Sequence, residues 1–450
     1  MRDDVFRKQL DRRTALKAGA AGAAAIGASR HLGASAQDAS PAAGSGFNVA
    51  DLQVSGDVEI EYWQYEYASK TELVNTLIPE FEAANPGITI KHVNFPYDDF
   101  RQQVAAAVQA GEGPDVLNVY FGWIPAYVQQ QFLQPLNAEW FPHEVIESDF
   151  FPMIAAGKVK EDYYALPTAV RTLALFCNMD HLGAAGKEPP TTWDELVDVA
   201  MATTQKDGDN FEVVGFTWDI GGQGHNWWRE ALIRQNGGLP TTEDNRTLQW
   251  TTAEAIEAFN YHVAFLTEHG VTQNGFETDG PTAFQNGKAA LHVDGSYRVG
   301  TYTANAPDLN YKVVPLPANK DQASFASFWA NTITRNAADG DKAIAAAKWI
   351  DFLASEDVMK RWTPAVGELP ARSALAEDPD LLANEKVAPF IESLPFSYAT
   401  FMVNEADLRQ AVIDAYDNVT LAGLDPEAAL QEAQDKIQAQ LDEYWASLDA

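Results

Sequence analysis

The fold is decided by residues 57–120, which include DVEIEYW (57–63), SKTELVNTLIPEFEAAN (69–85), ITIKHVNF (88–95), YDDFRQQVAAAVQA (97–110) and DVLNVY (115–120). The first, third and fifth segments are short and rich in β-branched and aromatic residues, which is typical of strands. The other two place apolar residues at helical spacing, and Ser69 stands where a helix cap is expected. Alternation of strand and helix predicts a lobe built on a parallel sheet.

The same alternation returns further along the chain. We expect strands at 174–178, 213–218 and 290–295, a helix at 193–205 entered through Thr192, and further helices at 253–269, 341–353, 405–416 and 426–448. A chain of 450 residues fills more than one hydrophobic core. The fold class is therefore predicted to be α/β with more than one lobe. Ligands of open α/β sheets bind at the carboxyl ends of the strands, so strand ends supply the candidate site residues.

The charge balance excludes one class of partner. The chain has 64 acidic and 31 basic residues, a formal net charge of −33. Such a field repels nucleic acids, so we expect no nucleic-acid partner. Cys177 is the single cysteine, which excludes an internal disulfide and cysteine-rich metal sites.

Residues 1–36 have the layout of a signal peptide. A basic start with Arg12–Arg13 precedes a weakly hydrophobic Ala/Gly core, as in twin-arginine export signals, and Ala34–Ala36 fits the cleavage pattern. Cleavage after Ala36 leaves 24 basic and 61 acidic residues. No cysteine follows the core, so we expect a periplasmic or extracellular protein without a lipid anchor. Residues 37–56 are predicted to form a flexible leader.

Signatures of catalysis are missing. The sequence contains neither H-E-x-x-H nor G-x-S-x-G. The segment 280–289 (GPTAFQNGKA) fails as a phosphate loop, because six residues separate its glycines and Ala289 replaces the hydroxyl that would bind magnesium. We therefore expect no enzyme, no metal site and no cofactor.

Aromatic residues gather at predicted strand ends and loops. An aromatic face stacks on the C–H face of a sugar while nearby polar groups bind its hydroxyls, so this pattern favours a carbohydrate site over a purely structural core. The aromatic residues concerned are Trp63, Tyr65, Tyr120, Trp123, Trp227, Trp228, Tyr297 and Trp329.

Several blocks in order resemble a known family over almost the whole chain after residue 57. They include F-E-x-x-N-P-x-I from residue 81, G-x-G-P-D-V from 111, P-x-T-W-D-E-L from 190 and F-x-x-G-K-A-A-L-x-x-D-G-S from 284. The sequence resembles family 1 extracellular solute-binding proteins, the sugar receptors of ABC importers, similar to maltose- and glycerol-3-phosphate-binding proteins.

The resemblance implies two lobes joined by a multi-segment hinge with the ligand between them: 57–166 with 319–367, and 167–318 with 368–450. It implies a monomer that captures a mono- or oligosaccharide or a sugar derivative and delivers it to a membrane permease. The ligand-binding residues that it implies, together with the strand-end pattern, are Trp63, Gln64, Tyr65, Tyr120, Trp123, Arg171, Trp227, Trp228, Asp294, Tyr297, Trp329 and Glu368.

Two positions depart from the family pattern and leave the ligand open. Arg171 and Tyr120 stand where sugar-binding relatives often carry acidic residues. A guanidinium favours a ligand with a carboxylate or phosphate, unless Arg171 pairs with a carboxylate of the protein itself. A glycerol phosphate ester or an organic anion on the same fold is therefore an alternative. Cleft carboxylates would instead favour a polyamine, and clustered tyrosines a metal complex. From another class, a secreted glycosidase also stays open.

Overall fold

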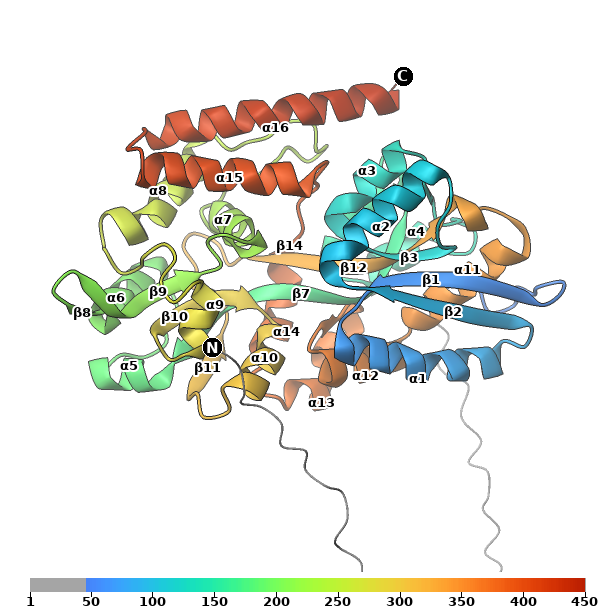
Figure 1. Cartoon of the computed structure of the whole chain (residues 1–450), viewed down its shortest axis with the longest axis horizontal. Helices are drawn as coiled ribbons and strands as arrows, with labels where there is room; N and C mark the ends of the chain where they lie inside the picture. Colours follow the sequence, from blue (N-terminus) through green and yellow to red (C-terminus); the bar gives the residue numbers. More distant parts are fainter. Residues whose placement is uncertain (1–45, 450) are drawn as a thin grey trace, which may run out of the picture. The chain divides into compact units, whose positions relative to one another are not determined.

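A computed structural model describes residues 46–449, which belong to one compact unit of the chain (Figure 1). The predicted signal peptide, its cleavage site and residues 37–45 of the leader lie outside the described residues. The prediction of a leader that reaches residue 56 is wrong, because Phe47 and Val49 are buried. The ring of Phe47 packs edge-on against Phe141, with 5.0 Å between centroids.

The segment that opens the fold forms the predicted parallel unit. Its elements are β1 (Val58–Tyr65), α1 (Ala68–Ala84), β2 (Ile88–Phe95), α2 (Tyr97–Ala110) and β3 (Val116–Tyr120). Strand β1 pairs in parallel with both β2 and β3, as expected. The predicted Ser69 cap is wrong: helix α1 begins at Ala68, the residue before it is Tyr67, and no side chain caps the helix. We call β2, β1 and β3 the first strand group.

Two long strands connect this group to the rest of the sheet. They are β7 (Ala165–Asn178) and β12 (Ser324–Thr334). Strand β12 runs antiparallel to both β3 and β7, and β7 continues beyond it to pair with β10 (Ala289–Gly295). The strand order β2-β1-β3-β12-β7-β10-β9-β8 therefore makes a single sheet through both halves of the fold.

The second half contains the predicted later strands and helices. We call β10, β9 and β8 the second strand group. Its elements are α5 (Met179–Ala185), α6 (Trp193–Thr203), β8 (Gln205–Asp207), β9 (Asn210–Trp218), α7 (Gln223–Gln235), α8 (Ala253–Thr267), α9 (Gly280–Gln285), α10 (Arg298–Asn305) and β11 (Tyr311–Val314). The hydroxyl of Thr192 accepts a hydrogen bond from the Glu195 amide, which confirms the predicted cap of α6. Gly215 of β9 lets α6 approach closely, since a Cβ there would lie 1.8 Å from the Ala200 carbonyl oxygen.

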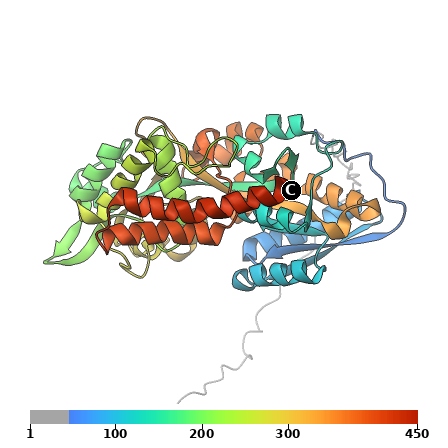
Figure 2. The same ribbon diagram turned by 90° about the horizontal axis from the view of Figure 1, so that it is seen from above.

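The chain ends in two helices, α15 (Glu405–Thr420) and α16 (Pro426–Asp449), which run side by side in Figure 2. Both pack on helices of the second half. The last turns of α16 extend to α3 (Ile124–Gln129), where the Gln129 side-chain amide donates a hydrogen bond to the Ser447 hydroxyl at 2.7 Å. The C-terminal helix therefore connects the two halves of the fold.

The remaining helices and strands complete the fold. They are β4 (Leu133–Gln134), α4 (His143–Asp149), β5 (Lys158–Val159), β6 (Asp162–Tyr163), α11 (Gly340–Leu353), α12 (Glu356–Val366), β13 (Leu369–Pro370), α13 (Pro379–Leu382), α14 (Ala388–Ser393) and β14 (Ser397–Tyr398). Among residues 46–449, no helix is both long and apolar enough to span a membrane.

Candidate ligand-binding site

Four of the predicted aromatic residues meet beside strand β12. Trp329 lies in β12, and the centroid of its ring is 4.3 Å from that of Tyr65, 5.9 Å from Tyr120 and 5.4 Å from Trp123. Tyr65 and Tyr120 are the last residues of β1 and β3, so the parallel pairing of these strands brings them to one edge. All four side chains are buried. We call these four residues the central aromatic cluster.

The other two predicted residues of β1 lie apart from this cluster. Trp63 is half-buried, packs edge-on against Phe95 at 4.8 Å and donates its indole hydrogen to Glu61. Gln64 is fully buried, and side-chain alternation places it on the opposite face of the strand from Tyr65. Neither amide atom of Gln64 has a hydrogen-bond partner in the described part of the chain.

Arg171 binds a carboxylate of the protein itself. Its Nε donates to Oε1 of Glu368 at 2.7 Å, its Nη2 also pairs with that oxygen, and Nη2 donates to the Tyr65 hydroxyl at 2.8 Å. Of the two interpretations that the sequence left open for Arg171, the structure shows the internal pair. The two predicted residues Arg171 and Glu368 are therefore brought together.

The environment of Glu368 explains why it stays ionised. Burial alone raises its pKa, but the positive charges of Arg171 and Lys70 hold the pKa below its ordinary value. The second carboxylate oxygen, Oε2, accepts a hydrogen bond from the indole nitrogen of Trp362 at 2.8 Å. Both oxygens of this carboxylate are thus engaged by the protein.

Lys70 is a buried charged group next to the cluster that the sequence analysis missed. Its Nζ lies 4.2 Å from the ring centroid of Tyr65 and donates a hydrogen bond to the side-chain oxygen of Asn118 at 2.6 Å. Only 1% of the residue is exposed, and this desolvation lowers its pKa to about 7. A lysine in the first turn of an amphipathic helix looks like a surface residue in the sequence, so no local signal marks it.

Asp294 orients Tyr297 at the end of β10. Its carboxylate accepts hydrogen bonds from Tyr297 Oη at 2.6 Å, Arg298 Nε at 2.7 Å and the Gly295 amide at 2.7 Å, and His292 Nε2 lies 3.2 Å away. Burial alone would raise the pKa of Asp294. The charge of Arg298 and the hydrogen bonds to the carboxylate lower the pKa by more than burial raises it, so the net shift is downward. The ring of Tyr297 in turn lies 5.2 Å from the guanidinium carbon of Arg171.

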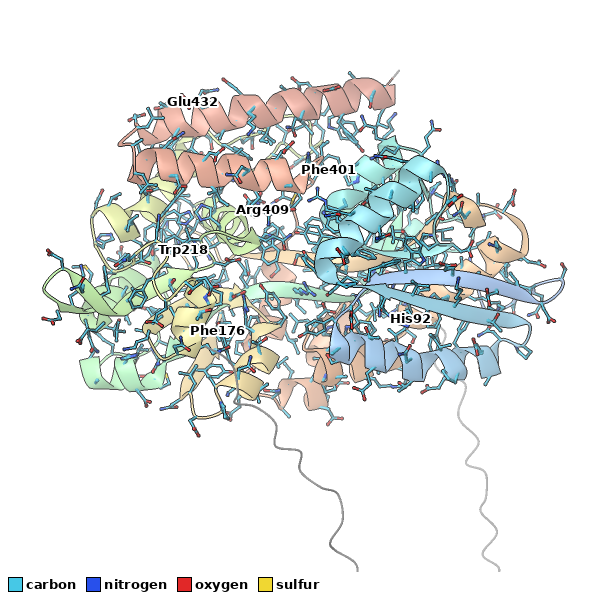
Figure 3. All side chains as sticks on the ribbon, viewed as in Figure 1. His92, Phe176, Trp218, Phe401, Arg409 and Glu432 are labelled. Carbon is cyan, nitrogen blue, oxygen red and sulfur yellow. The ribbon has the colours of Figure 1, made fainter. Side chains whose placement is uncertain are left out.

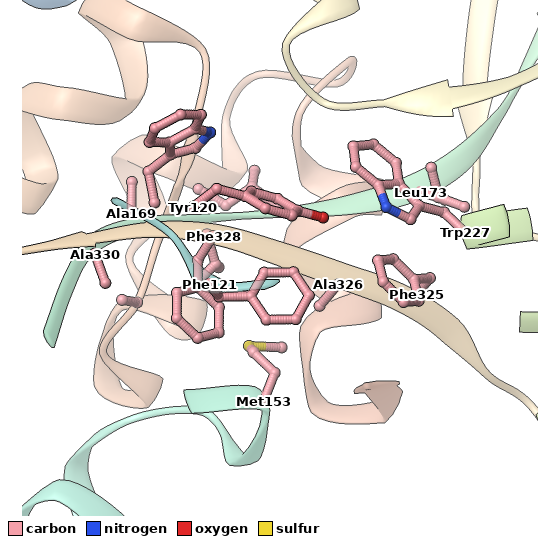
Figure 4. Close-up of a cluster of buried hydrophobic side chains, with 14 of the residues drawn as sticks. Tyr120, Phe121, Met153, Ala169, Leu173, Trp227, Phe325, Ala326, Phe328 and Ala330 are labelled. Atoms are coloured by element: carbon pink, nitrogen blue, oxygen red, sulfur yellow. The ribbon is translucent and has the colours of Figure 1, made fainter. Parts of the chain in front are cut away.

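Trp227 and Trp228 of α7 have different surroundings. Trp227 stacks on Phe325 with 5.7 Å between centroids, and Figure 4 shows the Tyr120 hydroxyl pointing toward the Trp227 indole nitrogen. Trp228 packs inside the second half of the fold, 5.0 Å from Trp218. Neighbouring residues on a helix point about 100° apart, which separates the two rings. The structure brings Trp227 to the central aromatic cluster and leaves Trp228 in a core.

A cavity of about 420 Å³ adjoins the cluster, and we call it the α16 cavity. It lies between α2 and α3 on one side and α16 with the start of α15 on the other. Figure 3 shows Phe401 beside the N-terminal end of α15, and Phe401 packs on Tyr444 of α16 with 5.7 Å between centroids. Of the predicted site residues, Trp123 lines this cavity. The α16 residues were not predicted, because the exposed face of an amphipathic helix carries no sign of a ligand.

Comparison with known proteins identifies the family of the chain. A putative binding protein of Brucella abortus is 27% identical over 411 residues, covering 88% of this chain and 96% of that protein. The maltotriose-binding protein of Pyrococcus abyssi is 23% identical and covers 76% of this chain and 73% of its own length. The crystal structure of the cyclic α-maltosyl-1,6-maltose binding protein from Arthrobacter globiformis superposes with a TM-score of 0.75 at 22% identity, covering 86% of this chain and 100% of that one.

The family model of bacterial extracellular solute-binding proteins matches residues 76–389, well over half of the chain. This match confirms the resemblance that the ordered sequence blocks indicated, and the α/β fold agrees with it. The chain belongs to the family of bacterial extracellular solute-binding proteins.

Proposed function

We propose that this protein is a receptor that captures a carbohydrate between two lobes and delivers it to the permease of an ABC importer. The observation that carries the proposal is the central aromatic cluster: three buried aromatic rings, from β1, β3 and the turn after β3, have their centroids within 6 Å of that of Trp329 in β12. Aromatic rings next to polar groups suit the two faces of a sugar.

The relatives support a carbohydrate as the ligand. One of them is a maltotriose-binding protein, and a structural neighbour binds a cyclic maltosyl-maltose. The internal pair of Arg171 and Glu368 points the same way, because it uses the guanidinium that would otherwise favour an anionic ligand. Arg171 was the sequence feature that favoured a glycerol phosphate ester or an organic anion, and it is now accounted for by Glu368.

The mechanism follows from contacts that join the two halves. Tyr65, on the first strand group, accepts a hydrogen bond from Arg171 on β7, and Tyr120 faces Trp227 on α7. A ligand that touches both halves stabilises the arrangement in which they meet, which shifts the population toward that form. We keep the predicted lobes, 57–166 with 319–367 and 167–318 with 368–450, as the units that move.

The proposed receptor acts outside the cytoplasm as a monomer. The Arg12–Arg13 motif supports twin-arginine export to the periplasm or the outside of the cell, and a protein without a lipid anchor fits a signal core that no cysteine follows. A monomeric receptor that returns its sugar unchanged, rather than a glycosidase, fits a family of binding proteins.

A sugar panel tests the proposal. The protein without residues 1–36 is titrated with mono- and oligosaccharides and with glycerol-3-phosphate and spermidine, following tryptophan fluorescence and melting temperature. A ligand at a hundred times its Kd stabilises the fold by roughly 2.7 kcal/mol. We expect this shift with at least one sugar. A shift with glycerol-3-phosphate or spermidine alone would replace the carbohydrate with that ligand, and hydrolysis of a labelled oligosaccharide would make the protein an enzyme.

A further inference from the structure

Lys70 lies against two rings of the central aromatic cluster. Its Nζ is 4.2 Å from the ring centroid of Tyr65 and 5.6 Å from that of Trp329, and both distances lie within the range of cation–π attraction. The centroids of the two rings are themselves 4.3 Å apart. The ammonium therefore attracts both rings at once and holds them in one position relative to α1.

A chain of buried hydrogen bonds holds the ammonium in place. Lys70 Nζ donates to Oδ1 of Asn118 at 2.6 Å, and Nδ2 of Asn118 donates to Oδ1 of Asn331 at 3.0 Å. Nδ2 of Asn331 in turn donates to Oγ1 of Thr168 at 3.2 Å. All four residues are at most 4% exposed, and they lie on α1, β3, β12 and β7. Such a chain rigidifies the groups around it, and it ties Lys70 to the strand that continues into the second half.

A charge in this position costs stability. Only 1% of Lys70 is exposed, and this desolvation disfavours the ammonium. A methionine of similar length would fill the same space without that cost. Stability is commonly given up where function requires it. A destabilising charge that contacts two rings of the candidate site therefore favours a role in binding rather than in folding.

The other charged or titratable groups that face Lys70 keep one charge state near neutral pH. Burial raises the pKa of Glu368 and lowers that of Arg171, but their mutual attraction outweighs burial in both, so both stay charged. Burial raises the pKa of Tyr65, and burial with the charge of Lys70 lowers the pKa of His92 to about 4. Lys70 is therefore the member of this group that changes its charge between pH 6.5 and 9.

We propose that Lys70 is a positioning residue, whose charged form holds Tyr65 and Trp329 in the arrangement that binds sugar. The inference rests on the proposed carbohydrate function. With 1% of its surface exposed, Lys70 acts through the two rings rather than by touching the ligand. Loss of its proton releases the rings from the cation, so the affinity for sugar falls as the pH rises. The same loss removes a buried charge, so the free energy of unfolding rises.

Calorimetric titration at pH 6.5 and pH 9 with the tightest sugar of the panel tests this role in the protein without residues 1–36. The variant Lys70→Met removes the charge and keeps the length of the side chain. Lys312→Met is the matched control, because it removes the charge of an exposed lysine on β11. Thermal melting at both pH values checks that each variant is folded and compares its stability with that of the parent.

We expect the Kd of the parent to rise roughly fivefold or more from pH 6.5 to pH 9. At pH 6.5 Lys70→Met should bind more weakly than the parent by a similar factor and yet melt at a higher temperature. Its Kd should change less than about twofold with pH. Lys312→Met should follow the parent at both pH values. A lysine with a purely structural role would instead change stability and affinity in the same direction.

An equal Kd of the parent at the two pH values would overturn the positioning role and leave the receptor function standing. A pH dependence that persists in Lys70→Met would have the same consequence. If Lys70→Met does not fold, the pH profile of the parent decides. If the parent binds no sugar, the receptor function fails and the role of Lys70 with it.

Discussion

Arg171 and Glu368 form an ion pair beneath the central aromatic cluster, with 2.7 Å between Nε and Oε1 and side-chain exposures of 18% and 6%. The pair holds Tyr65 through a hydrogen bond from the same guanidinium. Its position on β7 and next to β13 places it where the chain passes between the two halves. The two charges cancel inside the fold, so the Arg171 guanidinium leaves no unbalanced charge for an anionic ligand.

Removal of one member of this pair is expected to destabilise the protein. Arg171→Met leaves a buried carboxylate without its partner, which typically costs about 3–5 kcal/mol in the free energy of unfolding. The double variant Arg171→Met/Glu368→Gln removes the uncompensated charge and should regain part of that loss. Urea denaturation of the parent, both single variants and the double variant gives the coupling energy. Additive losses would show that the two side chains do not depend on each other.

Lys70 is expected to make stability depend on pH above neutrality. Burial lowers its pKa to about 7 in the folded protein, whereas in the unfolded chain the pKa is near 10.4. Between these values the unfolded state binds the extra proton, so the free energy of unfolding rises with pH, by about 1.4 kcal/mol per pH unit at most. Below pH 7 Lys70 is protonated in both the folded and the unfolded state. The free energy of unfolding then no longer changes with pH through this group, and the stability gained at higher pH is absent.

The variant Lys70→Met should remove this dependence. Its free energy of unfolding, measured by urea denaturation from pH 6.5 to 9.5, is expected to vary less with pH than that of the parent and to exceed it most at the acidic end. Burial and the charge of Lys70 lower the pKa of His92 to about 4, so in the folded protein this histidine does not titrate in this window. Parallel curves for parent and variant would contradict the assignment to Lys70.

The sequence predicted the parts of the site that local pattern determines. Tyr65 and Tyr120 stand at the ends of strands whose parallel pairing follows from alternation, so their meeting was foreseeable. Lys70 and the α16 residues of the cavity could not be predicted. A lysine on a helix becomes buried, and a polar helix face comes to line a cavity, only through tertiary packing. The same limit applies to Trp227 and Trp228, which are adjacent in the sequence but separated by the direction of the helix.

The acidic composition predicts that salt stabilises the fold. The chain has 64 acidic and 31 basic residues, of which 16 are lysines. At low ionic strength the excess carboxylates therefore repel one another and destabilise the fold. Salt at 1 M shortens the screening length to about 3 Å, against about 10 Å at 0.1 M. We expect the melting temperature to rise between 0.05 and 1 M NaCl, which would suit an exported protein in saline surroundings. A maximum at the lowest salt concentration would contradict this adaptation.

Replacing Trp227 and Trp228 by alanine, one at a time, distinguishes a side chain that binds the ligand from one that only packs in the core. Trp228→Ala leaves a void next to Trp218 and should lower the free energy of unfolding by about 3–5 kcal/mol, while the molecules that remain folded bind sugar as the parent does. Trp227→Ala removes a ring that faces Tyr120 and stacks on Phe325, so it should weaken sugar binding at least tenfold, with a smaller loss of stability. Urea denaturation and calorimetric titration with the tightest sugar distinguish these outcomes. If instead Trp228→Ala weakened binding and Trp227→Ala did not, the ligand would lie on the second strand group, away from the central aromatic cluster.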